Sequence, residues 1–598
     1  MRGFSALKRV LLLLPALSLS PGKSEAQECP QGEISYIFID NRSIFDTTEL
    51  PPDAPLLWAY KLANALHIRT REDFIQEELL FKTGDCLDLL RLSESERLLR
   101  SYRFIARSDV FAIPQSDGTQ HVVVDTQDEW TTKVDLGFRM ENGPRFTGIE
   151  LTEENLLGRG MGIRFFFEED KEQRDLGVEL ETPRLLNTRW DARIGAGRTR
   201  VGKFFEESLY FPFVGEVGRV AARQSHLWRE TLFSYAIPDD PDHTHLLVPF
   251  LDRRWDLLVG GRLGTPGDLT VFGAGLSWES IRFRRFPTDL ELVLDRDFSN
   301  TVPADAESIE AVQDQVQTRQ AKRINFFFAQ RNLRYVQRRG LDALTGIQDV
   351  QVGTEVLVGL GRALEVLGED GTRLADDVHT QVSIFAGRAW DGWTLNAQMS
   401  AEARQVYPER GEDGRWEDIF GEADVYLYWQ PDVSGPHTYL IRLSAAGGWS
   451  IKTPYQLTLG GHEAVRGYRD EAFPGGRRIV MSFEDRLYLP WPAPGLFDFG
   501  LSFFIDLGHM VPGGVPFGVD SGWRSAIGGG VRFGLPPGTG NMFRVDLAAP
   551  LGPKAKLSDL VLRISLNEVL GILPGFRDVQ LVRSLRSGVR PELISLPW

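Results

Sequence analysis

The stretch FDFGLSFFIDLG, residues 497–508, decides the fold class because its side chains alternate in polarity along its whole length. Large apolar side chains occupy one set of alternate positions, namely Phe497, Phe499, Leu501, Phe503, Ile505 and Leu507. The other set is mainly polar or small, namely Asp498, Gly500, Ser502, Phe504, Asp506 and Gly508. Successive side chains of a β-strand point to opposite faces, so this period of two predicts a strand with one apolar and one polar face.

The same alternation recurs from Thr131 onward, as in KVDLGFRME (133–141), RIVMSFEDRLYL (478–489) and DLVLRISLN (559–567). A periplasmic β-sandwich or propeller would also have apolar strand faces. Here, however, the polar faces carry charges of both signs beside glycine, as the wall of a water-filled lumen would. Short connections, such as 492–495 and 536–540, alternate with long ones, such as 460–476 and 509–523. This pattern predicts a membrane all-β fold, a transmembrane antiparallel β-barrel of about 16 and at most roughly 20 strands, over residues 131–570. The acidic, Gln-rich segment 301–323 is interpreted as a loop or external insertion.

The N-terminus has the pattern of a secretory signal peptide, which we place at residues 1–26. Arg2, Lys8 and Arg9 precede the short apolar run Val10–Leu17, and Ser24-Glu25-Ala26 fits a cleavage site. The alternative is an N-terminal anchor, but the apolar run is too short to span a bilayer. A formal net charge of −16 argues against nucleic acid as a partner.

No catalytic or metal-binding constellation stands out, so we expect no enzyme activity, no cofactor and no metal. The segment GHEAV (461–465) has one histidine and one glutamate but lacks the second histidine of a zinc-binding helix. The chain's two cysteines, Cys29 and Cys86, either form a disulfide in an oxidising compartment or are two unrelated thiols.

Residues 27–130 predict a small α/β domain with the order β-α-α-β-β. ISYIFI (34–39) alternates as a strand, and Thr70 is a candidate cap for the helix that follows it. SESE (93–96) has the pattern of a capping box at the start of a second helix. Two strands around the turn Ser116-Asp117-Gly118 complete the unit.

Several motifs, taken in order, resemble the BamA/TamA superfamily of outer-membrane insertases and polypeptide transporters (the bacterial surface antigen family). FIQEELLFKTGDCLD (74–88) and ESERLLRSYRFIARSDV (94–110) are similar to the helical segments of a single polypeptide-transport-associated (POTRA) domain. GIELTEENLLGRGMGI (148–163) is similar to the family's second barrel strand and the turn after it. VRGY (465–468) matches its signature loop, and FFIDLG (503–508) and FRVDLAAPLG (543–552) resemble its late strands.

The resemblance implies that the loop motif Val465, Arg466, Gly467 and Tyr468 folds back into the barrel lumen. Arg466 would then contact Asp506, with Glu484 nearby, and Gly508 would belong to the same anchoring wall. The alternation independently places Glu484 and Asp506 on the polar face of their strands. The competing interpretation is that Arg466 is a solvated residue in a glycine-rich turn.

The function implied by the resemblance is the insertion or translocation of β-strand-rich client polypeptides at the outer membrane, by strand augmentation at the barrel seam. The first strand would lie near 133–141 and the last near 559–567. Expected partners are the outer-membrane lipid bilayer, unfolded outer-membrane or secreted clients, and periplasmic chaperones or accessory proteins that meet a periplasmic POTRA domain. The alternatives are a dedicated exporter of one secreted protein, like the two-partner secretion transporters, and a structural surface-antigen barrel. The chain departs from the large insertases in having room for one POTRA domain, and its residues 571–598 form a C-terminal tail of undefined role.

Overall fold

The computed structural model describes residues 29–565 except for 46–56, 140–144, 171–172, 239, 241, 284, 296–297, 365–375, 408–412, 433–434, 463, 493–495, 536, 541, 553–555 and 557–558. The expected signal peptide at 1–26 and the C-terminal tail at 571–598 lie outside the described residues. Among the described residues, no helix is both long enough and apolar enough to cross a membrane.

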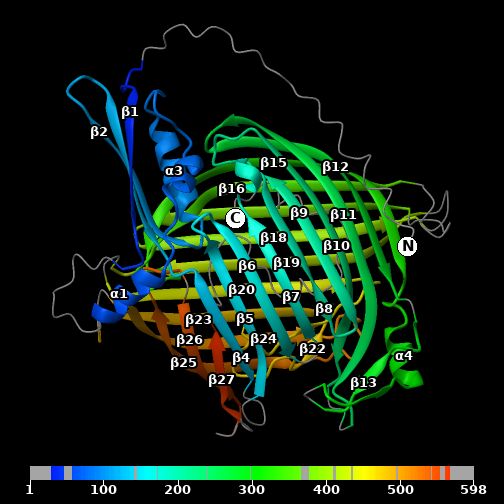
Figure 1. Cartoon of the computed structure of the whole chain (residues 1–598). Coiled ribbons are helices and arrows are strands. Elements are labelled where there is room, and N and C mark those ends of the chain that lie inside the picture. Colours follow the sequence, from blue (N-terminus) through cyan, green and yellow to red (C-terminus); the bar gives the residue numbers. More distant parts are fainter. Residues whose placement is uncertain are drawn as a thin grey trace.

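A closed antiparallel barrel forms most of the molecule, and its last strand, β27, lies beside its first, β4 (Figure 1). The described residues contribute about 20 long strands, the upper limit of the expected range and more than the 16 first expected. In order they are β4 (Thr132–Arg139), β5 (Arg145–Leu156), β6 (Met161–Asp170), β7 (Gln173–Thr182), β8 (Asp191–Thr199), β9 (Gly202–Phe211), β10 (Val220–Ala236), β11 (His245–Thr265), β12 (Asp268–Arg282), β15 (Arg319–Arg339), β16 (Ile347–Ala363), β17 (Asp377–Trp390), β18 (Trp393–Val406), β19 (Arg415–Trp429), β20 (His437–Trp449), β23 (Arg477–Leu489), β24 (Asp498–Val511), β25 (Gly522–Gly534), β26 (Met542–Leu551) and β27 (Val561–Ser565).

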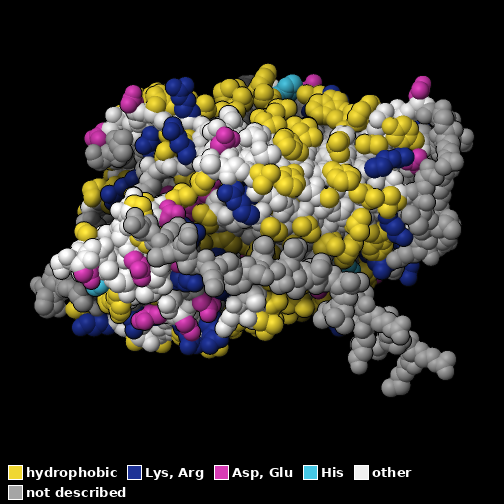
Figure 2. Space-filling model, turned by 90° about the horizontal axis from the view of Figure 1, so that it is seen from above, with side chains coloured by type: hydrophobic (Ala, Val, Ile, Leu, Met, Phe, Trp, Pro, Cys, Tyr) yellow, Lys and Arg dark blue, Asp and Glu magenta, His cyan; other side chains and the backbone are white. Residues whose placement is uncertain are grey.

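The burial pattern of the wall is inverted relative to a water-soluble protein. In β24, Phe503 is 54% exposed on the outside, whereas Asp506 is fully buried inside. In β23, Met481 and Phe483 are exposed, whereas Glu484 and Arg486 are buried. Apolar side chains gather over the outer surface of the barrel in Figure 2. An apolar exterior around a charged interior is the arrangement that a lipid environment favours.

Exposed tryptophans mark both ends of the strands. Trp390 and Trp429 lie where β17 and β19 end, and stacked rings of Trp390, Trp393, Trp429 and Tyr439 run across neighbouring strands. Trp416, Trp449 and Trp523 are exposed at the opposite ends of β19, β20 and β25. From Trp416 to Trp429 the strand spans ~43 Å, or ~33 Å along the barrel axis at a tilt of about 40°. The two sets therefore have the spacing of aromatic girdles at the two interfaces of a bilayer.

The N-terminal domain is a three-stranded sheet with helices on one side. Its sheet order is β1 (Ile34–Arg42), β3 (Gln120–Asp128), β2 (Ile105–Pro114), with β1 parallel and β2 antiparallel to β3. The helices are α1 (Leu57–Leu66), α2 (Glu72–Glu78) and α3 (Leu89–Arg100), one more than expected. The two cysteines form a disulfide, Cys29–Cys86.

Both helix starts expected in this domain were wrong. The N-cap of α2 is Arg71, which makes no side-chain capping bond, and the Thr70 backbone N–H donates to Asp128 instead. Helix α3 begins one turn before SESE, because the Asp88 carboxylate accepts from the N–H groups of Leu90 and Arg91. Ser93 therefore lies inside the helix, where its hydroxyl donates to the Leu90 carbonyl.

The N-terminal domain packs against one end of the barrel, here called the domain end, where the turns 157–160, 183–190 and 340–346 lie (Figure 1). Arg184, in the turn containing the short 3-10 helix η1 (Leu185–Asn187), pairs with Glu77 and Glu78 of α2 at 2.9 and 3.1 Å. On another part of the rim, Arg100 of α3 pairs with Asp349 of β16 at 3.0 Å. The domain thus contacts turns from separate parts of the barrel circumference.

The opposite end, here called the loop end, carries the long connections. Segment 283–318 contains β13 (Glu291–Val293), β14 (Thr301–Pro303) and α4 (Ala306–Val312). The expected insertion at 301–323 is therefore partly helical, and its last residues already belong to β15. Apolar side chains of this segment and of β10 and β11 form one buried cluster that includes Phe233, Tyr235, Leu246, Phe283, Leu292 and Val312.

Candidate functional site

The connection 450–476 between β20 and β23 leaves the wall and packs inside the barrel. Its short strands β21 (Leu457–Thr458) and β22 (Pro474–Gly475) pair with each other and close the base of a loop. The apolar residues of this lumen loop share one cluster with the inner wall: Tyr455, Leu457, Leu459, Ala464 and Val465 pack with Phe420, Val480, Met510 and Ala526. The loop is therefore seated by apolar contacts as well as by its charged residue.

Arg466 is fully buried at the tip of the lumen loop. Its Nε and Nη2 donate to the two Asp506 oxygens at 2.8 and 2.7 Å, and its backbone N–H donates to Asp506 Oδ2 at 3.0 Å. Its Nη1 donates to Glu484 Oε2 at 2.6 Å. The guanidinium also lies 3.5 Å from the centre of the Phe504 ring. The structure therefore brings together the three charged residues that the motifs singled out, and Arg466 is not a solvated turn residue. A guanidinium fork suits this bidentate contact, whereas an ammonium would not reproduce it.

Two glycines of the predicted set allow the loop to approach the wall. A Cβ on Gly467 would lie 2.5 Å from the Ala526 Cβ, so any side chain there would push the loop off the wall. A Cβ on Gly508 would lie 2.8 Å from side-chain atoms of both Leu459 and Val465. Gly508 thus contributes a hollow that receives the loop, rather than an anchoring contact.

The remaining motif residue, Tyr468, stacks edge-on against Phe473, and its hydroxyl lies 3.4 Å from the Ser525 carbonyl.

Glu484 is the centre of a wider charge network on the inner wall. Besides Arg466, it accepts from Arg486 Nε at 2.9 Å and from both terminal nitrogens of Arg544 at 2.9 and 3.1 Å. Arg544 also donates to Asp546 at 2.6 Å. Three arginines therefore face the carboxylates of Glu484, Asp506 and Asp546, and Arg486 also pairs with the buried Asp342 at 3.0 Å, so each buried charge of this group has an opposite partner.

Arg563 of β27 is a site residue that the motif analysis missed. Its Nε donates to the Arg466 carbonyl and its Nη1 to the Asp470 carboxylate, each at 2.8 Å, while its Nη2 donates to the Tyr468 carbonyl. One side chain of the last strand thus holds three points of the lumen loop. The one sign of this role in the sequence was that Arg563 is a charged residue on the polar face of the expected last strand, DLVLRISLN (559–567), next to the seam.

Asp418 of β19 is a second residue that the motifs did not indicate. It lies at a β-bulge opposite β18 and has a left-handed backbone with φ of 48°. Its carboxylate accepts from Arg404 and Arg319, and it also accepts the Lys452 backbone N–H at 2.7 Å. The bulge therefore directs a buried carboxylate toward the first residues of the lumen loop.

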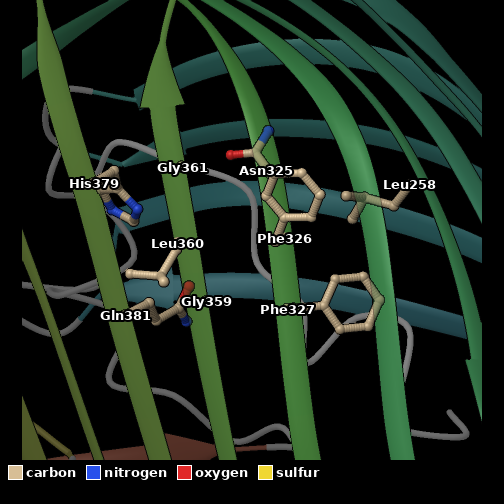
Figure 3. Close-up of a pocket in the computed structure, with 9 residues that line it drawn as sticks. All are labelled: Leu258, Asn325, Phe326, Phe327, Gly359, Leu360, Gly361, His379 and Gln381. Carbon is tan, nitrogen blue, oxygen red and sulfur yellow. The ribbon is translucent and has the colours of Figure 1, made fainter.

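A small hollow in the wall is lined by nine residues of β11, β15, β16 and β17 (Figure 3), and His379 is the one ionisable side chain among them. Among the described residues, no group of three or more histidine, cysteine, aspartate or glutamate side chains is placed to hold a metal ion.

No protein-family model and no curated protein matches the sequence. Among solved structures, the chain is similar to CdiB from Escherichia coli, with 11% identity, 92% of each chain covered and a TM-score of 0.43. It is also similar to BamA from Haemophilus ducreyi lacking POTRA domains 1–3, with 9% identity, 88% of this chain and 83% of that chain covered, and a TM-score of 0.35. CdiB from Acinetobacter baumannii gives 10% identity, 89% and 73% coverage, and a TM-score of 0.33. Identities and TM-scores this low transfer no residue role.

The chain itself is a transmembrane antiparallel β-barrel with a small N-terminal domain and a lumen-inserted loop, which is the fold expected from the BamA/TamA superfamily that its motifs resemble.

Proposed function

We propose that the chain inserts or translocates β-strand-rich polypeptides at the bacterial outer membrane, with the seam between β4 and β27 as the working edge. The observation that carries this proposal is the contact between the last strand and the lumen loop. Arg563 of β27 holds the loop backbone, and Arg466 holds the same loop to β23 and β24. The position of the loop and the position of the seam strand are therefore physically linked.

Over the described residues, the two seam strands are shorter than the strands that hold the lumen loop. The described part of β27 has 5 residues and β4 has 8, compared with 13 or 14 in β23 and β24. In lipid, an unpaired strand edge leaves N–H and C=O groups unsatisfied, so an opened seam favours pairing with an incoming strand.

The lumen loop acts as a latch in this proposal. While it is seated, Arg563 keeps β27 drawn toward the wall network around Glu484. When the loop moves, the three contacts of Arg563 break together, and β27 is then held by its pairing with β4 and by its ladder with β26, which pairs five of the described residues. Loop movement and seam opening thus become one event.

The N-terminal domain, at residues 27–130, is a periplasmic POTRA domain in this proposal. It lies at the domain end, where unfolded clients and the chaperones that deliver them would arrive. Residues 131–570 would form the barrel in the outer membrane. The aromatic girdles and the apolar exterior support this placement.

A dedicated exporter of one secreted protein is the second candidate. The number of strands favours it, because barrels of 16 to 18 strands already leave an aqueous channel and about 20 enclose more space. The charged inner wall suits the passage of a polar extended chain.

Depletion of the protein in its host, followed by quantitative proteomics of the outer membrane and the medium, tests the proposal. A fall in many outer-membrane barrels supports an insertase, and loss of one secreted or surface protein supports the exporter. Unchanged proteomes would refute both and leave a structural barrel. Complementation with Arg563→Gln should fail, whereas the matched Arg174→Gln, at the exposed start of β7, should restore the wild-type proteome.

A further inference from the structure

Helix α1 is the helix that the expected β-α-α-β-β order did not include, and it presents an apolar stripe to the outside. Trp58, Leu62 and Leu66 recur at every fourth residue, so they lie along one face of the helix. Their side chains are 69%, 51% and 68% exposed, respectively. Ile68, two residues past the helix end, is 57% exposed as well. An apolar helix face of this kind normally lies against another apolar surface.

The opposite face of α1 is fixed to the N-terminal domain. The Asn64 side chain exchanges two hydrogen bonds with the backbone of Phe45, donating to its carbonyl at 2.8 Å and accepting from its N–H at 3.1 Å. The Tyr60 ring is buried, and its centre lies 4.5 Å from the centre of the Phe45 ring. These contacts fix the rotation of the helix about its axis and direct the apolar stripe away from the domain.

The residues that follow α1 are seated on the barrel rim. His67 Nε2 lies 2.9 Å from the buried Asp128 carboxylate, and the Arg71 N–H donates to the Gly158 carbonyl at 2.8 Å. A Cβ on Gly158 would lie 2.3 Å from the Arg69 carbonyl oxygen, so the two backbones are in direct contact. The helix is therefore held at the domain end of β4 and β5, where Figure 1 shows it beside the rim.

The lipid-facing surface of the barrel ends next to this attachment. Val134 is exposed on the outside of β4, and Trp130 continues the exposed positions beyond the strand end at the same period of two. The turn after β5 carries the exposed Leu157 directly before Gly158. Tryptophan at the end of a strand is typical of the membrane–water interface. The apolar stripe of α1 and the apolar exterior of the barrel thus adjoin at one interface of the bilayer.

Positive charge flanks the stripe in a chain that is acidic overall. Residues 57–71 contain Lys61, Arg69 and Arg71 and no acidic residue, whereas the whole chain has a formal net charge of −16. Lys61 and Arg69 are exposed, while Arg71 pairs with Asp73 at 3.1 Å. An apolar stripe bordered by cations is complementary to a leaflet with anionic phospholipid headgroups.

We propose that α1 lies in the headgroup region of the phospholipid leaflet at the domain end, with its apolar stripe toward the acyl chains and with Lys61 and Arg69 at anionic headgroups. The helix is then a second membrane attachment of the chain besides the barrel. Because its other face is fixed to Phe45, insertion of the stripe sets the orientation of the N-terminal domain relative to the membrane plane. The inference rests on the transmembrane barrel and not on the polypeptide that the barrel handles.

The test uses the full-length protein in lipid nanodiscs with a nitroxide spin label at Leu62→Cys. Cys29 and Cys86 form a disulfide, so the introduced cysteine is the one free thiol of the chain. The label should collide often with oxygen, which concentrates in lipid, and rarely with a water-soluble nickel chelate. The same label at Ser116→Cys, in the exposed turn between β2 and β3, should show the reverse.

Two results of this measurement overturn the proposal. One is a label at position 62 that is as accessible to the nickel chelate as the label at position 116, because the stripe then faces water. The other is a label shielded from both oxygen and the nickel chelate, because a segment of this chain or a second copy then covers the stripe instead of lipid.

The ratio of lipid-contacting to water-contacting label gives a second readout. Leu66→Ser should lower this ratio about tenfold, because one side chain of the stripe no longer buries its apolar surface. Leu89→Ser, at a similarly exposed leucine of α3, should leave it unchanged. Lys61→Gln should lower the ratio about fivefold in nanodiscs with phosphatidylglycerol and should have no effect in phosphatidylcholine alone. Equal effects of Leu66→Ser and Leu89→Ser, or a Lys61→Gln effect that does not depend on phosphatidylglycerol, overturn the proposal.

Discussion

Replacing Arg466 with alanine should be among the most damaging single changes in the barrel. The side chain is fully buried and donates two hydrogen bonds to the Asp506 carboxylate, and the Arg466 backbone N–H donates a third. Truncation leaves the buried Asp506 carboxylate without a neighbouring cation. Removing one partner of a buried pair typically costs about 3–5 kcal/mol, because the other charge stays uncompensated.

The structure predicts which second substitution should recover part of this loss. Adding Asp506→Asn to Arg466→Ala removes the stranded charge and should return about 1–3 kcal/mol. Adding Glu484→Gln should return none, because Glu484 keeps Arg486 and Arg544 and its charge is still needed by them. The two double variants thus separate the role of each carboxylate.

The assay is equilibrium unfolding in lipid vesicles with guanidinium chloride, followed by tryptophan fluorescence. Arg477→Ala is the matched control, since this arginine near the base of the same loop contacts the Gly448 carbonyl and the Trp449 ring and should cost about 1 kcal/mol or less. The reasoning fails if Arg466→Ala lies within about 0.5 kcal/mol of wild type, or if Asp506→Asn and Glu484→Gln have the same effect in its background.

Three further outcomes follow from other parts of the molecule. Replacing Cys29 and Cys86 by serine should destabilise the N-terminal domain by about 4 kcal/mol, given the separation of 57 residues, with the barrel transition unchanged in calorimetry. Phe503→Arg, on the lipid-facing side of β24, should cost about 2–4 kcal/mol in vesicles, whereas Trp523→Arg near the loop-end girdle should cost about 0–1 kcal/mol. Burial raises the pKa of Glu78, partly offset by Arg184, so wild type loses stability as pH rises through that raised pKa. Glu78→Gln should therefore lose less stability than wild type between about pH 4 and pH 7, and an unchanged pH dependence in the variant would contradict this.

Strand faces in the membrane region could be predicted from sequence because lipid outside and charge inside impose a strict period of two. Residues 497–508 show this, and Glu484 and Asp506 both face the lumen as the period requires. The number of strands was predicted less accurately than the strand faces. At the loop end, β11 begins with His245–Leu251, where both faces are largely buried in the apolar cluster, so alternation disappears.

The residues of the candidate site that belong to a sequence motif could be predicted. Those that reach the site only through the three-dimensional fold could not. VRGY identified Arg466, and the polar faces identified its carboxylates. Arg563 donates mainly to backbone carbonyls of the loop. Every residue has a backbone carbonyl, so the sequence does not show which residues Arg563 contacts. The bulge at Asp418 shifts the strand register by one residue. Such a shift is not visible in the alternation of polar and apolar residues along the sequence. The start of α3 was missed because Asp88 and Ser93 both belong to residue types that favour the N-cap, and the structure uses Asp88.

In the proposed function the seam between β4 and β27 must open, and a covalent cross-link across these two strands tests this most directly. Val134 and Ile564 are both exposed on the outer face of these strands, so cysteines at 134 and at 562 or 564 can be joined by a bismaleimide, which leaves the native disulfide intact. The cross-linked protein should lose client insertion or export in reconstituted vesicles, and the same protein treated with a monofunctional maleimide should retain it. Full activity of the cross-linked seam would contradict the account.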